Sequence, residues 1–138
     1  MFIRGGPLKL SDSVVENVQG VGIRLRNVKV SQNVLDGVTV QGVSPNVDLI
    51  DDAGILNELL STLTLKNSLV MDNTVTGIVN LAYYDLRIQN SVIINNRAVE
   101  IGGIFADGME KSVYIQNSII TNNYGKTVAF IRKRKPRK

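Results

Sequence analysis

The clearest feature of the chain is an eleven-residue pattern that occurs three times in its second half. The copies cover residues 63–73, 86–96 and 113–123, and each alternates apolar and polar residues before an Asn-Ser pair. Two apolar residues, a variable residue, an Asp or Asn and a final Asn follow. Alternation with a period of two is typical of a strand with one buried face. Each copy therefore predicts a half-buried strand that turns at its Asn residues.

Two weaker copies extend the pattern toward the N-terminus. Residues 23–33 place Asn27 at the position of the first Asn, and residues 8–18 place Asp12 there. In the strong copies this Asn recurs at spacings of 23 and 27 residues, at Asn67, Asn90 and Asn117. Hairpin strands lie much closer together in sequence than this. The spacing indicates a solenoid, in which each repeat forms one coil and pairs in parallel with the next coil.

The pattern resembles the right-handed parallel β-helix repeat of pectin-lyase-like proteins, phage tailspikes and many surface proteins. Two stretches are also similar to the repeat of polymorphic outer-membrane proteins, which pairs an F-x-x-N element with a G-G-A-[ILV] element. Here residues 93–96 read Ile-Ile-Asn-Asn, and residues 102–105 read Gly-Gly-Ile-Phe. The resemblance covers residues 8–125 and implies an all-β, right-handed parallel β-helix of about five coils. It implies little about function, because this fold hosts lyases, hydrolases, adhesins and inert scaffolds.

Asn side chains at one corner of such a solenoid are expected to form a structural ladder. Each side-chain amide can donate to the side-chain carbonyl of the Asn in the neighbouring coil. The residues assigned to the ladder are Asn27, Asn67, Asn90 and Asn117. An Asn-lined ligand site is the alternative, and no other residue supports it. The glycines that follow the Asn pairs are expected to supply positive φ angles, at Gly77, Gly102, Gly103 and Gly125.

The composition agrees with a chain made mostly of strands. Val and Ile together number 32, whereas Ala numbers 5, and β-branched residues favour strands. Residues 51–63 depart from the pattern, because their apolar positions 55, 56, 59, 60 and 63 have helical spacing. Asp51 and Asp52 stand where acidic residues stabilise a helix N-terminus. This stretch predicts a short amphipathic helix that covers part of the β-helix.

The chain contains neither Cys nor His. This excludes disulfides, thiol nucleophiles, the Ser-His-Asp triad, and metal sites built from thiolates or imidazoles. Carboxylates, Lys and Tyr remain as possible catalytic groups, and no cofactor is predicted. No apolar run approaches the roughly 18 residues of a membrane-spanning helix. The N-terminal residues also lack the long apolar stretch of a signal peptide, so the sequence leaves the compartment open.

Most of the positive charge lies at the C-terminal end. The net charge is +4, yet residues 132–138 alone carry six basic residues, and the rest of the chain has 10 basic and 12 acidic residues. We therefore expect a β-helix repeat domain over 1–131 and a disordered basic tail over 132–138. Such a tail suits an anionic partner such as nucleic acid, an anionic membrane surface or an acidic protein. Its charged residues are Arg132, Lys133, Arg134, Lys135, Arg137 and Lys138.

Outward positions of the repeated strand carry half of the remaining basic residues. Aligned on the first Asn, the positions three residues and one residue before it form two columns, with about 4.8 Å between coils. The residues assigned to this predicted basic face are Lys9, Arg24, Arg26, Lys66, Arg87 and the neighbouring Tyr114. The hypothesis is a groove for an acidic polymer, such as a uronic-acid polysaccharide. The alternative is a solvated sheet face whose charges discourage association.

The carboxylates form no catalytic pattern. Asp51 and Asp52 resemble the adjacent carboxylates of β-helix polygalacturonases, but the His and the Arg-Ile-Lys element of that family are missing. Helix capping explains the pair better. Pectate lyases hold calcium with several carboxylates and use an Arg as base. Calcium needs six to eight oxygen ligands, and no Asp/Glu cluster recurs at matching positions of successive copies, so no metal site is predicted.

Two functions remain open from the sequence. The first is a non-catalytic β-helix module, structural or adhesive, within a larger chain or assembly. Solenoid ends expose unpaired strands and core, so a protein partner or the remainder of a longer chain is expected to cover an end. The second is a carbohydrate-active β-helix protein that binds or cleaves acidic polysaccharide on the basic face. A third hypothesis makes the tail the functional part and the solenoid its spacer.

Overall fold

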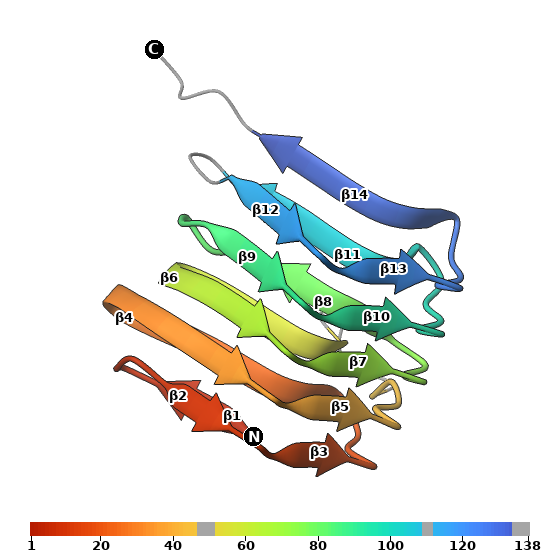
Figure 1. Ribbon diagram of the computed structural model, residues 1–138, viewed down its shortest axis with the longest axis horizontal. Coiled ribbons are helices and arrows are strands. Elements are labelled where there is room, and N and C mark those ends of the chain that lie inside the picture. The colour runs from red at the N-terminus through yellow and green to blue at the C-terminus, as the bar shows by residue number, and fades with distance from the viewer. Residues whose placement is uncertain (47–51, 109–111, 134–138) are drawn as a thin grey trace.

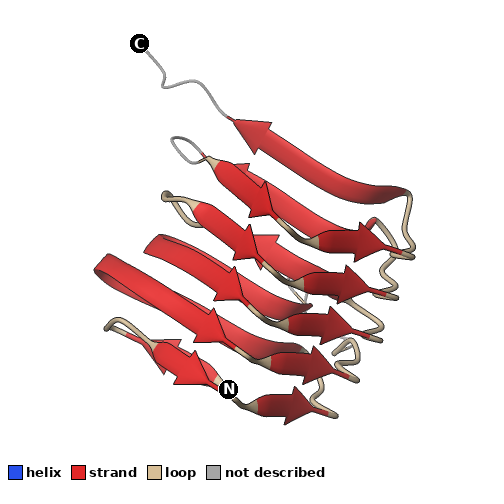
Figure 2. Ribbon diagram, in the orientation of Figure 1, coloured by secondary structure: helices blue, strands red, loops and turns tan. Residues whose placement is uncertain are grey.

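The computed structural model describes residues 1–46, 52–108 and 112–133. These residues form fourteen strands and no helix (Figure 2). The strands are β1 (Phe2–Arg4), β2 (Lys9–Ser11), β3 (Val14–Glu16), β4 (Val21–Asp36), β5 (Thr39–Gln41), β6 (Ala53–Lys66), β7 (Leu69–Met71), β8 (Thr76–Asn80), β9 (Leu86–Gln89), β10 (Val92–Ile94), β11 (Ile101–Gly108), β12 (Val113–Gln116), β13 (Ile119–Thr121) and β14 (Thr127–Lys133).

The strands wind into a parallel solenoid of about five coils (Figure 1). Each coil gives a first and a second segment to a nine-stranded sheet and one strand to a five-stranded sheet. The first and second segments are continuous in β4 and β6 and separate in the other coils. Coil 1 comprises β1, β2 and β3; coil 2, β4 and β5; coil 3, β6 and β7; coil 4, β8, β9 and β10; coil 5, β11, β12 and β13. The last strand, β14, pairs with β11 and is the first segment of a sixth coil.

The parallel register places equivalent aliphatic residues of successive coils on top of one another, and these columns build the core. One inward column crosses the second segments, and another crosses the five-stranded sheet. Their middle members are fully buried, and each such side chain contributes about 1.5–3 kcal/mol relative to an exposed one. The columns are Leu10, Leu35, Leu65, Ile88, Ile115 and Val15, Val40, Val70, Ile93, Ile120.

Each coil turns at two corners where one residue adopts a left-handed conformation, with φ between 47° and 66°. Only Asn, Asp and Gly occupy these corners, because Gly lacks a Cβ and the short polar side chains of Asn and Asp tolerate that conformation best among the others. The first corner separates the two sheets, and the second follows the five-stranded sheet. The residues are Asp12, Gly37, Asn67, Asn90, Asn117 at the first corner and Asn17, Gly42, Asp72, Asn95, Asn122 at the second.

The corner positions correct the predicted alignment of the second coil. Asp36 pairs with Lys66, so Gly37 stands where the third coil has Asn67, and the copy covers 33–43 instead of 23–33. Asn27 therefore lies outside the corner column, buried within β4 beside a register shift between Asn27 and Ser31. The error arose because Gly37-Val38 replaces the Asn-Ser pair, while the alternating residues before Asn27 imitate the repeat.

A column of glycines permits close approach between first segments. A Cβ on Gly22 would lie 2.6 Å from the carbonyl oxygen of Gly54, and one on Gly54 would lie 2.7 Å from that of Gly77. A Cβ on Gly77 would lie 2.9 Å from the carbonyl oxygen of Gly103. The predicted positive φ angles at Gly77, Gly102, Gly103 and Gly125 are wrong, since the positive-φ glycines are Gly5, Gly20, Gly37 and Gly42.

The predicted helix over 51–63 is wrong, because residues 53–66 form strand β6. Its apolar positions mimic a helix because both faces of the strand bury apolar side chains. Ile55 packs in the main core, whereas the adjacent Leu56 packs in a second cluster with Val79. Asp52 accepts a hydrogen bond from the backbone N–H of Asn46 instead of capping a helix. Asp51 lies outside the described residues.

Candidate functional site

The predicted basic face is divided between two parts of the nine-stranded sheet. Lys9, Thr64, Arg87 and Tyr114 share one outward column, in which coil 2 contributes Val34. A second column contains Ser11, Asp36, Lys66, Gln89 and Gln116.

Arg24 and Arg26 do not join these columns. They lie in the first segment of β4, where Arg24 pairs with Phe2 and Leu56, and Arg26 pairs with Arg4 and Glu58. The corrected alignment of coil 2 is the reason. The structure therefore does not bring all five cations into the two adjacent columns that the sequence predicted.

Three cations of this predicted face contact carboxylates. Lys66 lies 3.0 Å from Asp36, and the Arg87 guanidinium lies 2.7 Å from Asp85. Arg24 donates two hydrogen bonds to Glu58, at 2.8 and 3.2 Å. These carboxylates come from positions that the repeat alignment did not include. Each of them offsets one positive charge, which weakens the field available to an acidic polymer.

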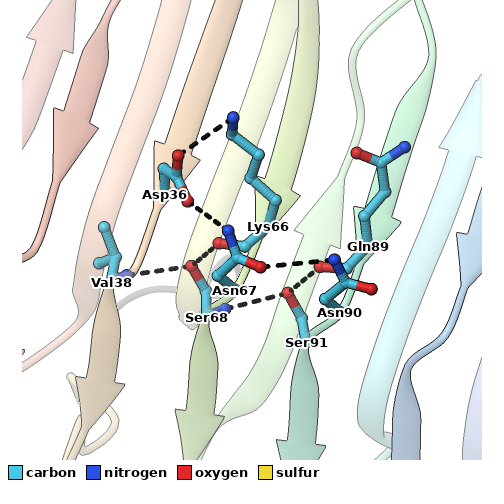
Figure 3. A network of polar contacts seen from close by, with 8 residues as sticks. All are labelled: Asp36, Val38, Lys66, Asn67, Ser68, Gln89, Asn90 and Ser91. Atoms are coloured by element: carbon cyan, nitrogen blue, oxygen red, sulfur yellow. Dashed lines mark hydrogen bonds and ion pairs between the residues drawn. The ribbon is translucent and has the colours of Figure 1, made fainter.

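The first corner carries a polar network that links coils 2, 3 and 4 (Figure 3). Asn67 donates to Asp36 at 2.8 Å, and Asn90 donates to Asn67 at 3.4 Å. Both Asn side chains are exposed. Within this corner column Gly37 has no side chain and Asp12 has no amide, so the side-chain contacts do not continue to coil 1.

Asp36 is the group in this network with a shifted pKa. The hydrogen bond from Asn67 lowers the pKa of Asp36 most, and the neighbouring Lys66 lowers it further, while partial burial opposes them. A lowered pKa means that Asp36 adds stability above its unfolded-state pKa of about 3.9, and that this stability is lost as the pH falls through the folded-state value.

We expect Asn67→Gly to raise the pKa of Asp36 toward its ordinary value. Glycine retains the positive φ of this corner, as Gly37 does one coil earlier, but removes the donor to the carboxylate. An NMR titration of the Asp36 carboxyl carbon measures the change. Asn117→Gly, at the same corner two coils away, is the matched control and should leave this pKa unchanged. An unchanged pKa in Asn67→Gly would show that Lys66 alone sets it.

The buried Asn ladder lies at a different column from the one the sequence analysis assigned. Asn73 donates to Asn96 at 2.7 Å, and Asn96 donates to Asn123 at 2.9 Å. All three are at least nine-tenths buried. Each of them is the second residue of an Asp-Asn or Asn-Asn pair. Their shared 23- and 27-residue spacing was visible in the sequence, but the left-handed residue before each one reverses the inward and outward parity.

Ser side chains form a second column just after the first corner. The backbone N–H of Val38 donates to Ser68 Oγ at 3.0 Å, and the N–H of Ser68 donates to Ser91 Oγ at 3.1 Å. The N–H of Ser91 donates to Ser118 Oγ at 3.1 Å. Each hydroxyl in turn donates to a backbone carbonyl two residues earlier. The Ser and Asn columns therefore join every coil from the second to the fifth.

Comparison with known families identifies the solenoid. A family model described as "Right handed beta helix region" matches residues 1–135. The chain belongs to this family. No curated protein and no solved structure matches the chain. The predicted right-handed parallel β-helix is thereby confirmed.

The β-helix extends into the segment that the sequence analysis assigned to the tail. Arg132 and Lys133 belong to β14, and the Arg132 guanidinium bonds to Asp107 of the preceding coil. The boundary predicted at residue 131 is therefore too early by at least two residues. The remaining tail residues, Arg134, Lys135, Arg137 and Lys138, lie outside the described residues.

The described part of the β-helix contains neither a carboxylate cluster for a metal ion nor a membrane-spanning helix. In residues 1–46, 52–108 and 112–133, no three Asp or Glu side chains converge as metal ligands would. Within the same ranges, no helix has the length and apolar character needed to cross a bilayer.

Both ends of the β-helix expose apolar side chains that are buried in the middle coils. At one end, Ile115 is 43% exposed and Ile131 is 52% exposed, although their partners Ile88 and Ala106 are fully buried. At the other end, Phe2 is 57% exposed.

Proposed function

We propose that the chain is a non-catalytic β-helix module with a structural, scaffolding or adhesive role in a larger chain or assembly. One observation carries this proposal: the polar residues that recur from coil to coil bond to one another. Asn73, Asn96 and Asn123 are buried, and their amides bond to the neighbouring coils. A recurring polar column is the natural place for a ligand site in a solenoid, and here it stabilises the stack instead.

The same contacts support rigidity. In a solenoid each coil contacts only its neighbours, so stability depends on every coil-to-coil interface. The Ser and Asn columns add side-chain hydrogen bonds to the parallel backbone ladders at the three interfaces from coil 2 to coil 5. A stiff body with apolar ends suits a spacer or scaffold, and we propose that protein covers at least one end. The basic residues from Arg134 onward are proposed to bind an anionic partner.

A second candidate, binding or cleavage of an acidic polysaccharide, is favoured by one contact. The Arg87 guanidinium lies 5.5 Å from the centre of the Tyr114 ring, and Tyr114 is exposed. An exposed ring beside a cation can stack on a sugar and pair with its carboxylate. Lys66 and Gln89 lie in the adjacent column.

An assay on polygalacturonate, with and without calcium, separates the non-catalytic module from an enzyme that cleaves this polysaccharide. We expect neither unsaturated products nor new reducing ends. Cleavage that is lost in Arg87→Ala and retained in Arg97→Ala would overturn the non-catalytic proposal. Arg97 is the matched control, because it also stacks on a tyrosine, Tyr124, but at another corner. A rigid stack also predicts slow exchange with deuterium at the backbone N–H groups of Ser68, Ser91 and Asn96. Exchange as fast as that of an exposed loop would contradict the rigidity.

A further inference from the structure

The two ends of the β-helix are staggered by one strand. At the C-terminal end, β14 adds a first segment beyond coil 5, and among the described residues no second segment and no strand of the five-stranded sheet lies beyond β12 and β13. At the N-terminal end, coil 1 has all three parts, β1, β2 and β3. Two copies stacked end to end would therefore place β14 of one copy and β1 of the next at the same site.

These two strands have the same sequence in the same register. β1 reads Phe-Ile-Arg at residues 2–4, and β14 contains Phe-Ile-Arg at residues 130–132. The strand pairings connect Phe2 to Phe130 through one column: Phe2, Arg24, Leu56, Val79, Phe105 and Phe130. Ile3 and Ile131 belong likewise to one inward column. The last strand thus presents to a following coil the side chains that β1 presents to β4.

We propose that a second copy of this chain binds end to end, with β14 of one copy replacing β1 on β4 of the next. This inference rests on the proposed scaffolding function and names its partner. The exchange removes the steric conflict, because β1 leaves the site that β14 enters. It also lets β12 pair with β2 and β13 pair with β3, which continues both sheets into the next copy.

The new contacts repeat those inside one chain. Leu8 and Leu10 of the next copy would lie on Val113 and Ile115, and Val15 would lie on Ile120. The β1 strand is a weak competitor, since it has three residues and an exposed Phe2. β14 has seven residues, and its Phe130 stacks on Phe105 at 5.6 Å.

The Ser column also continues across the junction. Ser13 Oγ donates to the carbonyl of Ser11 at 2.7 Å, in the geometry that Ser118 adopts with Gln116 at 2.8 Å. Ser13 of the next copy would therefore accept from the backbone N–H of Ser118, as Ser118 accepts from Ser91. Because the same two unlike surfaces meet at every junction, the assembly is open and can grow beyond a dimer.

A site-directed crosslink tests the junction. The β12–β2 pairing would make Gln116 and Ser11 neighbours, whereas within one chain they are four coils, or about 19 Å, apart. Ser11→Cys/Gln116→Cys is the test variant, and the chain has no native Cys. We expect a short bis-maleimide to give a ladder of covalent multimers. Ser11→Cys/Thr121→Cys is the control, because Thr121 lies in the other sheet, and it should give no ladder. Equal crosslinking of both variants, or of neither, would overturn the proposal.

Sedimentation velocity over a range of concentrations tests the exchange itself. The wild-type mass should rise with concentration in steps of 15.1 kDa. Ile131→Lys should weaken association about tenfold or more, and Val30→Lys, an equally charged change at an exposed position of coil 2, should not. Ile3→Asp weakens β1 alone, so it should strengthen association under exchange, whereas weaker association would reject exchange. A monomer at every concentration would overturn the inference and leave the non-catalytic proposal to the polygalacturonate assay.

Discussion

Gly54→Ala should lower the melting temperature of the β-helix by about 4–12 °C. The new Cβ would lie 2.7 Å from the carbonyl oxygen of Gly77, a backbone atom of the next coil. Val70 and an Asn73 amide at 3.2 and 3.3 Å close the other directions. The coils must therefore separate locally, and overpacking of this kind costs about 1–3 kcal/mol. For a chain of this size that corresponds to about 4 °C per kcal/mol. Thermal unfolding followed by circular dichroism measures the shift.

Gly6→Ala is the matched control for this substitution. A Cβ on Gly6 meets nothing within 4 Å, and the φ angle of Gly6 is not positive. The same chemical change should therefore leave the melting temperature unchanged or raise it slightly, because alanine restricts the unfolded chain. Equal effects of the two substitutions would show that the glycine column is not a close-contact column.

The sequence predicted the second half of the fold well because each coil there contains every signal of the repeat. Alternating strand residues, a left-handed Asn, a Ser and a second Asn recur together in coils 3, 4 and 5. In coil 2 the corner residue is Gly37, which satisfies the same backbone requirement without the recognisable side chain. Gly37 is equivalent to the corner Asn residues in its backbone conformation and not in its side chain. A search for recurring side chains therefore does not find it.

Two further errors have one physical origin, which is contact across coils. Residues 53–66 looked helical because Leu56 is buried on the face of the strand opposite to Ile55. The basic face looked continuous because Asp36 and Glu58, which contact Lys66 and Arg24 from neighbouring coils, were not among the residues aligned with these cations. Both facts depend on which residue is stacked on which, and an error of alignment in one coil moves every column in that coil.

The buried Asn column explains why position 96 should tolerate valine poorly. Asn96 accepts from the Asn73 side chain at 2.7 Å, and donates to the Val70 carbonyl at 3.0 Å and to Asn123 at 2.9 Å. The same column holds Val43 in coil 2, whose backbone N–H donates to Asn73. Valine fits there because no Asn of the preceding coil needs it as an acceptor. At position 96 it would leave the Asn73 amide facing a methyl group.

We therefore expect Asn96→Val to destabilise the β-helix by about 2–4 kcal/mol, since buried polar groups that lose a partner cost about 1–3 kcal/mol each. Chemical denaturation, read as a lower midpoint with an unchanged slope, measures it. Asn95→Gly is the control, because Asn95 is exposed and Gly keeps its positive φ, so the cost should be small. If Asn96→Val were as mild as Asn95→Gly, the buried column would not hold the coils together, and the main support for a structural role would be removed.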